Sequence, residues 1–190
     1  MNFIKSVYAG LVIGLGGYVY LGCDNKVVGA FLFSIGLLAV LTFGFNLYTG
    51  KVCYTKYLAR PKKLAAIWAG NLLGAWCMAF LAAGHGNVIN TAKMVVDNKL
   101  TKNPGVLLLD SIICGFCIAI AVKGFARAAD LGKHLLVVLG VMVFILGGAE
   151  HCVADMFYLF CGRVYSLSGL MLLVIVTLGN TLGGIVFSWL

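Results

Sequence analysis

The sequence predicts an all-α membrane protein with six transmembrane helices, and three observations lead to that prediction. The chain has 190 residues, of which 62% are hydrophobic and 11% are charged, and its mean hydropathy is +1.04. Its apolar residues lie in continuous runs of roughly 20, which is the length of one membrane-spanning helix. These runs lack the alternation over roughly 10 residues that is typical of transmembrane strands. A soluble monomer is therefore excluded, and residues 1–190 are expected to form a single membrane domain.

Six charge-poor runs give the predicted spans in chain order. They are 3–22, 27–50, 64–83, 104–122, 135–161 and 164–190. No small-residue cleavage site follows the first run, so we expect it to be retained as a span and not removed as a signal peptide. The longest connection, about 84–103, is polar and is expected outside the membrane.

The charges indicate how the chain is oriented. There are 14 lysine and arginine residues against 6 acidic residues, and the basic residues lie between the apolar runs. This pattern is typical of membrane topology, so no nucleic-acid partner is expected. A cytoplasmic amino terminus leaves nine basic residues inside and five outside, which favours that orientation. We therefore expect a multi-pass protein of the inner (plasma) membrane with both termini in the cytoplasm.

The second and fifth segments are predicted to be broken helices. Residues 27–59 would form a helix of about 50 Å, whereas the hydrocarbon core is about 30 Å thick. The candidate breaks are Gly44–Gly50 and Gly147–His151, where glycine and polar residues interrupt the apolar run. Irregular backbone at membrane depth survives only inside the protein or beside an aqueous cavity. Both breaks are therefore candidates for a functional site.

The two halves of the chain repeat. Gly44-Phe45-Asn46 lies 104 positions before Gly148-Ala149-Glu150, and the G-N-x-x-G segment at 70–74 lies 109 positions before the one at 179–183. With repeat one at about 1–92 and repeat two at about 93–190, each half has three spans. An odd number of spans requires that the second copy be inserted upside down, as in many channels and transporters.

The breaks carry the residues that could perform chemistry. An ionisable residue inside a span is by default a functional candidate, and we expect His151 to face a pathway, where it could exchange a proton near neutral pH. Glu150 is expected to point elsewhere with a structural role, because neighbours on a helix do not share a face. Thr49 offers a hydroxyl in the other break. Half-helix amino termini aimed at the membrane centre would favour an anion.

Other chemistry finds little support in the sequence. Cys114 and Cys117 have the CxxC spacing but lie inside a span without a partner pair, so no metal is predicted. No nucleotide-binding loop is present, and no cofactor is expected. Large apolar residues on the broken segments could instead form constrictions above and below the site. These candidates are Phe33, Leu37, Leu47, Tyr48 and Phe144.

Taken together, these residues resemble the formate/nitrite transporter family over essentially the whole chain. Residues 147–156, G-G-A-E-H-C-V-A-D-M, resemble that family's G-F-E-H-x-x-A-N-M signature, with Asp155 in place of asparagine. Residues 43–50, F-G-F-N-L-Y-T-G, are similar to its G-[AE]-[DE]-L-F-T loop. The two G-N-x-x-G segments fall where the family's third and sixth helices carry them.

The resemblance implies a homopentamer in which each protomer has its own six-helix, aquaporin-like pore. It assigns Thr49 and His151 to the substrate pathway, together with an external-side lysine twelve residues before the fourth helix, here Lys99 with Lys102 as its rival. It places Phe33 and Phe144 on the outer side of the pore and Leu37, Leu47 and Tyr48 on the inner side. Glu150, Asn71 and Asn180 are expected to give structural support.

The sequence thus predicts a channel or proton-coupled facilitator for small monovalent weak-acid anions. Formate is the first candidate, followed by nitrite, hydrosulfide and short carboxylates, with His151 lending or relaying the proton. The alternative is a neutral-solute channel of aquaporin type, which would need neither the histidine nor the lysine. A membrane-embedded enzyme lacks clustered ligands or a nucleophile with its base, and a purely structural subunit would not explain two polar breaks.

Overall fold

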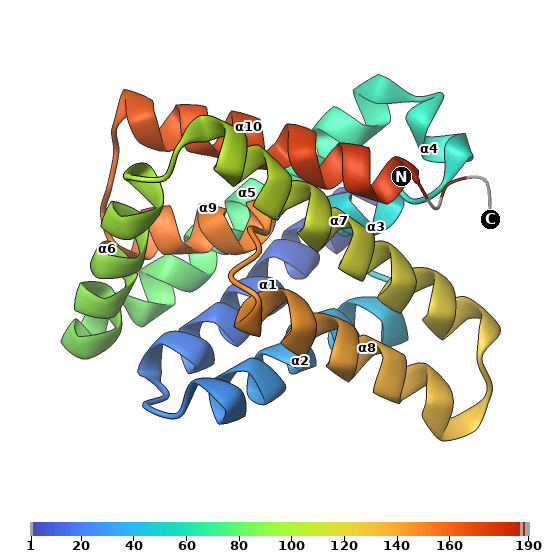
Figure 1. The fold of residues 1–190 in the computed structure, drawn as a ribbon, viewed down its shortest axis with the longest axis horizontal. Helices are drawn as coiled ribbons and strands as arrows, with labels where there is room; N and C mark the ends of the chain where they lie inside the picture. Colours follow the sequence, from blue (N-terminus) through green and yellow to red (C-terminus); the bar gives the residue numbers. More distant parts are fainter. Residues whose placement is uncertain (1, 187, 189–190) are drawn as a thin grey trace.

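The computed structural model describes residues 2–186 and 188 and contains only helices in that part of the chain (Figure 1). The predicted end of the sixth segment, at 187 and 189–190, lies outside the described residues. The helices are α1 Ile4–Gly22, α2 Lys26–Thr42, α3 Tyr48–Lys51, α4 Thr55–Leu58, α5 Pro61–Leu81, a 3-10 turn Ala82–Gly84, α6 Gly86–Leu100, α7 Pro104–Arg127, α8 Asp130–Leu146, α9 Cys152–Cys161 and α10 Leu167–Ile185.

The lengths of these helices agree with a protein that crosses a membrane several times. Within the described residues, four helical stretches are long and apolar enough to cross: Ile4–Gly22, Pro61–Gly84, Pro104–Arg127 and Leu167–Ile185. Two apolar helices are shorter, Lys26–Thr42 and Cys152–Cys161. The all-α prediction is confirmed.

Both predicted interruptions are present as turns of irregular backbone. α2 ends at Thr42 and α3 begins at Tyr48, while α8 ends at Leu146 and α9 begins at Cys152. Gly44 and Gly148 have φ of +64° and +71°, in the left-handed region that residues with a Cβ avoid. The first break is shorter than predicted, because Thr49 and Gly50 already belong to α3.

Glycine lets two pairs of long helices lie in direct backbone contact. A Cβ added at Gly74 of α5 would collide with the carbonyl oxygen of Val7 in α1. A Cβ added at Gly183 of α10 would likewise collide with the carbonyl oxygen of Ile112 in α7. Small residues at such crossings are how helices associate tightly in a bilayer. The two G-N-x-x-G segments therefore lie at helix crossings.

The polar connection at 84–103 contains a helix, α6, over Gly86–Leu100. Its apolar residues Val88, Ala92 and Val96 are spaced four apart and are all buried. This spacing places them on one helical stripe, which packs on the bundle while the polar residues face outwards. The sequence of this segment is polar overall because only this narrow stripe of the helix is buried.

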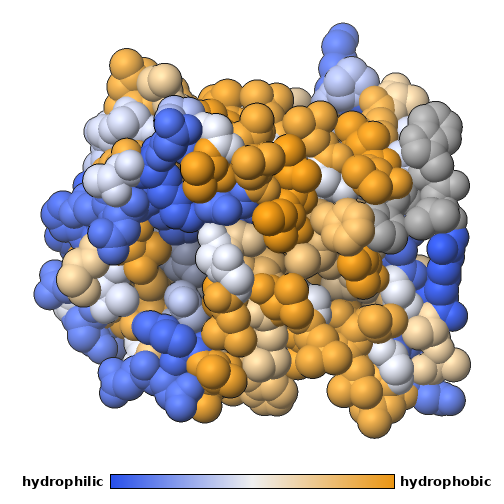
Figure 2. All heavy atoms as spheres, in the orientation of Figure 1, coloured by the Kyte–Doolittle hydropathy of each residue, from blue (hydrophilic) through white to orange (hydrophobic). Residues whose placement is uncertain are grey.

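Charge divides the molecule into two unlike ends. Figure 2 shows an apolar band across the middle of one face, with hydrophilic side chains towards both ends. The end with the start of α5 and the α7–α8 turn carries nine basic residues and Asp130 as its one acidic residue. The α6 end carries five basic and five acidic residues. The whole formal charge of +8 therefore belongs to the first end.

Candidate functional site

The two breaks meet at a hydrogen bond between Thr49 and His151. Thr49 Oγ1 and His151 Nε2 are 2.9 Å apart, although the residues are 102 positions apart in sequence. Both are buried, with relative exposures of 1% and 3%. The two residues that the sequence analysis singled out in separate breaks are thus in direct contact in the interior.

The backbone around His151 determines which ring nitrogen carries the proton. The N–H of Ala154 donates to Nδ1 of His151 at 3.2 Å, so Nδ1 acts as an acceptor. In a neutral imidazole the proton then lies on Nε2, which donates to the Thr49 hydroxyl. The Thr49 hydroxyl hydrogen is left to donate to another group. The site therefore presents a neutral histidine and a threonine O–H.

Asn71 holds the first break in place from α5. Its Nδ2 donates to the carbonyl oxygens of Ser6 and Asn46, each at 2.8 Å. Its Oδ1 accepts the N–H of Tyr48 at 2.8 Å, at the start of α3. One buried amide thereby satisfies backbone groups that the interrupted helix leaves without partners.

Asn180 makes the corresponding contacts at the second break. Its Nδ2 donates to the carbonyl oxygens of Ser111 and Glu150, each at 2.8 Å. Its Oδ1 accepts the N–H of Cys152 at 2.9 Å, at the start of α9. Each asparagine thus bonds three backbone groups beside a break, and the supporting role expected of both stays a prediction.

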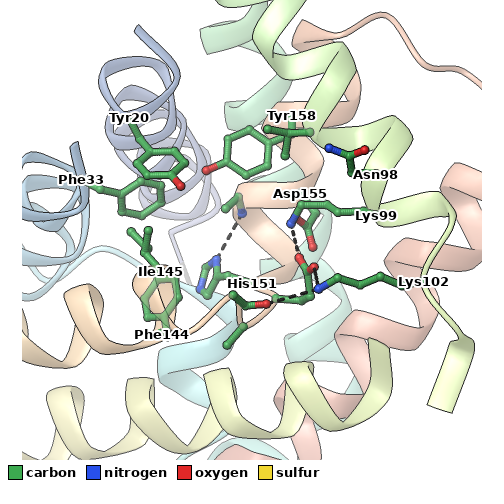
Figure 3. Close-up of a pocket in the computed structure, with 15 residues that line it drawn as sticks. Tyr20, Phe33, Asn98, Lys99, Lys102, Phe144, Ile145, His151, Asp155 and Tyr158 are labelled. Carbon is green, nitrogen blue, oxygen red and sulfur yellow. Dashed lines mark hydrogen bonds and ion pairs between the residues drawn. The ribbon is translucent and has the colours of Figure 1, made fainter. Parts of the chain in front are cut away.

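A cavity of about 240 Å³ adjoins the second break (Figure 3). Phe33 and Phe144 line it with ring centroids 6.2 Å apart and planes perpendicular. Phe144 also stacks on His151, with centroids 5.8 Å apart. Tyr20 and Tyr158 complete its aromatic wall. Two of the predicted constriction residues thus lie together beside the histidine.

Charged side chains line the other wall of this cavity. Lys99 of α6 pairs with Glu150 and, at 2.7 Å, with Oδ1 of Asp155. Lys102 pairs with Oε1 of Glu150 and with Asp110, both at 2.8 Å. It also donates to the Gly148 carbonyl oxygen at 3.3 Å. The α6–α7 connection is therefore tied to the second break by ion pairs.

The two lysines keep their charge in this setting. Burial lowers the pKa of Lys99, but the Asp155 and Glu150 carboxylates raise it more, so the pKa lies above its ordinary value. Burial likewise lowers the pKa of Lys102, and hydrogen bonds to Asp110 and Glu150 prevail and raise it. Both lysines are ammonium groups at neutral pH.

Glu150 and His151 have different partners, although they are neighbours in sequence. Both residues line the same cavity, and Glu150 is bonded to both lysines. His151 instead bonds Thr49. Residues 150 and 151 lie in the non-helical break before α9, where His151 has an extended φ of −115° and ψ of 114°. Extended backbone points neighbouring side chains to opposite sides, so the two residues reach different partners for a reason other than the helical spacing on which the expectation relied.

The predicted inner constriction residues do not all meet. Leu37 and Leu47 are both buried at 1% exposure, and Leu47 lines a smaller cavity of about 120 Å³ with Lys51 and Tyr54. The Tyr48 hydroxyl is 2.8 Å from the hydroxyl of Thr181, and Tyr48 lines a separate apolar groove of about 400 Å³ between α5 and α10.

Sequence reasoning named Lys102 only as a rival of Lys99 and missed the ion pairs that Lys102, Asp110 and Asp155 form. Asp110 lay in a predicted span without a recognisable partner, and Lys102 supplies that partner. Asp155 follows His151 by four residues, and its N–H donates to the His151 carbonyl at 2.9 Å, so the two residues lie one helical turn apart. The four-residue spacing between His151 and Asp155 was the signal in the sequence that could have placed Asp155 near the site. Among the described residues, no group of three histidine, cysteine or acidic side chains could hold a metal ion.

The apolar helices, the interrupted segments and the buried polar centre define a multi-pass membrane protein of the transporter class. The sequence profile described as "Formate/nitrite transporter" matches residues 1–190. The chain belongs to the formate/nitrite transporter family, as its sequence motifs predicted.

Named relatives and solved structures agree with this assignment. The chain is 30% identical to "Nitrite transporter NirC" of Salmonella typhimurium, across 99% of this chain and 80% of that protein. It is 24% identical to "Formate channel BtFdhC" of Bacillus thuringiensis, across 84% of this chain and 69% of that one. These relatives are a transporter and a channel, which agrees with the expectation that the chain is not an enzyme.

The fold is shared with solved channels. An "FNT family ion channel" superposes with a TM-score of 0.84 and 27% identity, covering 98% of this chain and 86% of that one. A "Pentameric formate channel with formate bound" superposes with a TM-score of 0.83 and 24% identity, covering 97% and 92%.

Proposed function

We propose that the protein is a channel or proton-coupled facilitator for small monovalent anions of weak acids. Formate is the first candidate, followed by nitrite, hydrosulfide and short carboxylates. One observation carries this proposal: Thr49 and His151 meet at 2.9 Å in the interior, beside a cavity whose wall contains an ammonium group. The relatives named above carry formate and nitrite in their names, which supports the same class of substrate.

The chemistry of the centre suits such an anion. The Thr49 hydroxyl hydrogen and the amino terminus of α9, which begins directly after His151, both favour negative charge. Phe33 and Phe144 favour an uncharged molecule, and desolvation there would raise the pKa of an entering weak acid. An anion that gains a proton at this point could continue as the neutral acid.

A neutral-solute pore of aquaporin type is the weaker alternative. Such a pore would require neither a buried histidine nor the charged cluster formed by Lys99 and Lys102. Family membership also favours an anion substrate.

We further infer that the chain forms six membrane-crossing segments in two inverted repeats. The matching hydrogen bonds of Asn71 and Asn180 support this architecture, because each asparagine bonds three backbone groups in the same pattern. The left-handed glycines Gly44 and Gly148 occupy corresponding places in the two breaks.

The assembly we propose is a homopentamer with one pore in each protomer, embedded in the inner membrane with both termini in the cytoplasm. The pentameric formate channel of the same fold supports the stoichiometry. The basic end supports the orientation, because positively charged loops remain on the cytoplasmic side. Native mass spectrometry in mild detergent should give a pentamer, and monomers or dimers alone would contradict this assembly.

The test of function is flux into proteoliposomes. Formate, nitrite, hydrosulfide and glycerol are compared side by side at several external pH values, with a pH dye inside the vesicles. We expect formate to enter and acidify the lumen. Glycerol flux without flux of any of the anions would support the neutral-solute alternative and overturn the proposal.

A further inference from the structure

The cavity of about 240 Å³ beside the second break, called the outer cavity from here on, has negative charge on its wall, which is unexpected for a site that receives an anion. Lys99 and Lys102 supply two ammonium groups, and Glu150 and Asp155 line the same cavity with two carboxylates. Asp110 adds a third carboxylate, which is paired with Lys102. When all five groups are ionised, the cluster is negatively charged. An arriving anion therefore meets lysines that already have carboxylate partners (Figure 3).

These carboxylates differ in how firmly they are held. Glu150 is bonded through both oxygens, to Lys99 through Oε2 and to Lys102 through Oε1. Asp155 is bonded to Lys99 through Oδ1 alone, at 2.7 Å. Its second oxygen, Oδ2, is buried and has no hydrogen-bond partner. A buried carboxylate oxygen without a partner is unfavourable, so the position of Asp155 is the less stable of the two.

Asp155 also has the chemistry of the proposed substrate. Its side chain ends in a carboxylate, and a small carboxylate anion would seek the same ammonium group on Lys99. Lys99 Nζ has two carboxylate partners and lies 5.4 Å from the ring of Tyr158, so little of its surface is left for a third anion. Its side chain is 13% exposed. Of its two carboxylate partners, Asp155 loses fewer bonds when it is displaced.

We propose that Asp155 is a tethered competitor of the transported anion for Lys99 and thereby sets how tightly the outer cavity takes that anion. The inference rests on the proposed function, because it requires that the cavity receives a small anion. Asp155 then sets the affinity of the cavity: it weakens capture of the anion without taking part in passage through the Thr49–His151 centre.

The experiment measures formate uptake into proteoliposomes as a function of concentration, at low ionic strength. Asp155→Asn keeps the shape of the side chain and removes its charge. We expect the KM for formate to fall about tenfold, because a like charge near the binding ammonium is removed, while the maximal rate stays within about twofold. Asp155→Ser should also lower the KM for formate. It replaces Asp155→Asn in the experiment if the asparagine variant cannot be reconstituted into vesicles.

Two controls separate competition on Lys99 from a general effect of charge. Asp97→Asn removes one negative charge from the same end of the molecule, but among the described residues Asp97 forms an ion pair only with Lys93, and its side chain is half exposed. Its KM should match that of the wild type. In a Lys99→Gln background, Asp155→Asn should change the KM little, because the group for which both anions compete is gone.

The outcomes distinguish this inference from the function on which it rests. A wild-type protein that carries no formate, nitrite or hydrosulfide overturns the proposed function, and the inference with it. A wild-type protein that carries formate, combined with an unchanged or higher KM in Asp155→Asn, overturns the inference alone. An equal fall in KM for the Asp155 and Asp97 variants would also overturn it, since the effect would then be one of net charge.

Discussion

Replacing Asn180 by alanine tests whether the second break is held by one side chain. The substitution removes three buried hydrogen bonds, to the Ser111 and Glu150 carbonyls and from the Cys152 N–H. Ser111 lies within α7 and keeps its intrahelical partner, whereas the other two groups belong to the break. Taking roughly 1 kcal/mol for each bond, we expect the variant to lose about 3 kcal/mol of unfolding free energy.

The assay is reversible unfolding in mixed micelles of a mild and a denaturing detergent, followed by circular dichroism. Asn90→Ala is the matched control, because Asn90 is an exposed asparagine on α6. Its unfolding free energy should stay within about 0.5 kcal/mol of the wild type. If Asn180→Ala were as mild as this control, the surrounding helices and not the amide would hold the break, and the reasoning would be refuted.

Three further substitutions test the site and the fold. Thr49→Val keeps the shape but leaves the His151 Nε2–H without its acceptor, so formate flux should fall about tenfold, with recovery in Thr49→Ser; unchanged flux would remove Thr49 from the pathway. His151→Asn should preserve the fold and abolish the acidification of the vesicle lumen that accompanies formate uptake, and undiminished acidification would show that the proton comes from elsewhere. Gly115→Ala places a Cβ against the backbone of Asn180, so thermal unfolding should show a loss of about 2 kcal/mol, and a wild-type melting temperature would contradict the close crossing.

Much of the fold could be predicted because the bilayer limits what a chain can do. Long apolar runs must be helices. A run that is too long for the hydrocarbon core and contains glycine and polar residues is a candidate for an interrupted helix. Gly44 and Gly148 could therefore be found from the sequence, and both have the left-handed backbone that an interruption requires. The helix α6 was less visible, because only three of its residues, Val88, Ala92 and Val96, are buried against the bundle and the rest of its composition is mostly polar.

The site was harder to predict, because its contacts depend on directions that only the folded backbone sets. The sequence indicated His151 and Thr49 but not the tautomer of His151 or the direction of its hydrogen bond to Thr49. Both follow from the Ala154 N–H, which donates to Nδ1 of His151. Glu150 and His151 were expected to point in different directions by a helical rule, whereas it is the extended backbone of the break that gives these neighbours different partners. The pairing of Lys102 with Asp110 spans the turn before α7, where sequence spacing gives no rule for which side chains meet.

The unequal charge of the two ends has an electrical consequence. Moving one elementary charge across a membrane potential of about 100 mV takes about 2.3 kcal/mol. With the basic end on the negative side, as proposed, inverting the molecule would carry its formal charge of +8 against that potential. The work is about 18 kcal/mol for each 100 mV, comparable to or above the whole stability of a typical domain. In an energised membrane, voltage alone would keep each protomer from reversing its orientation once it has been inserted.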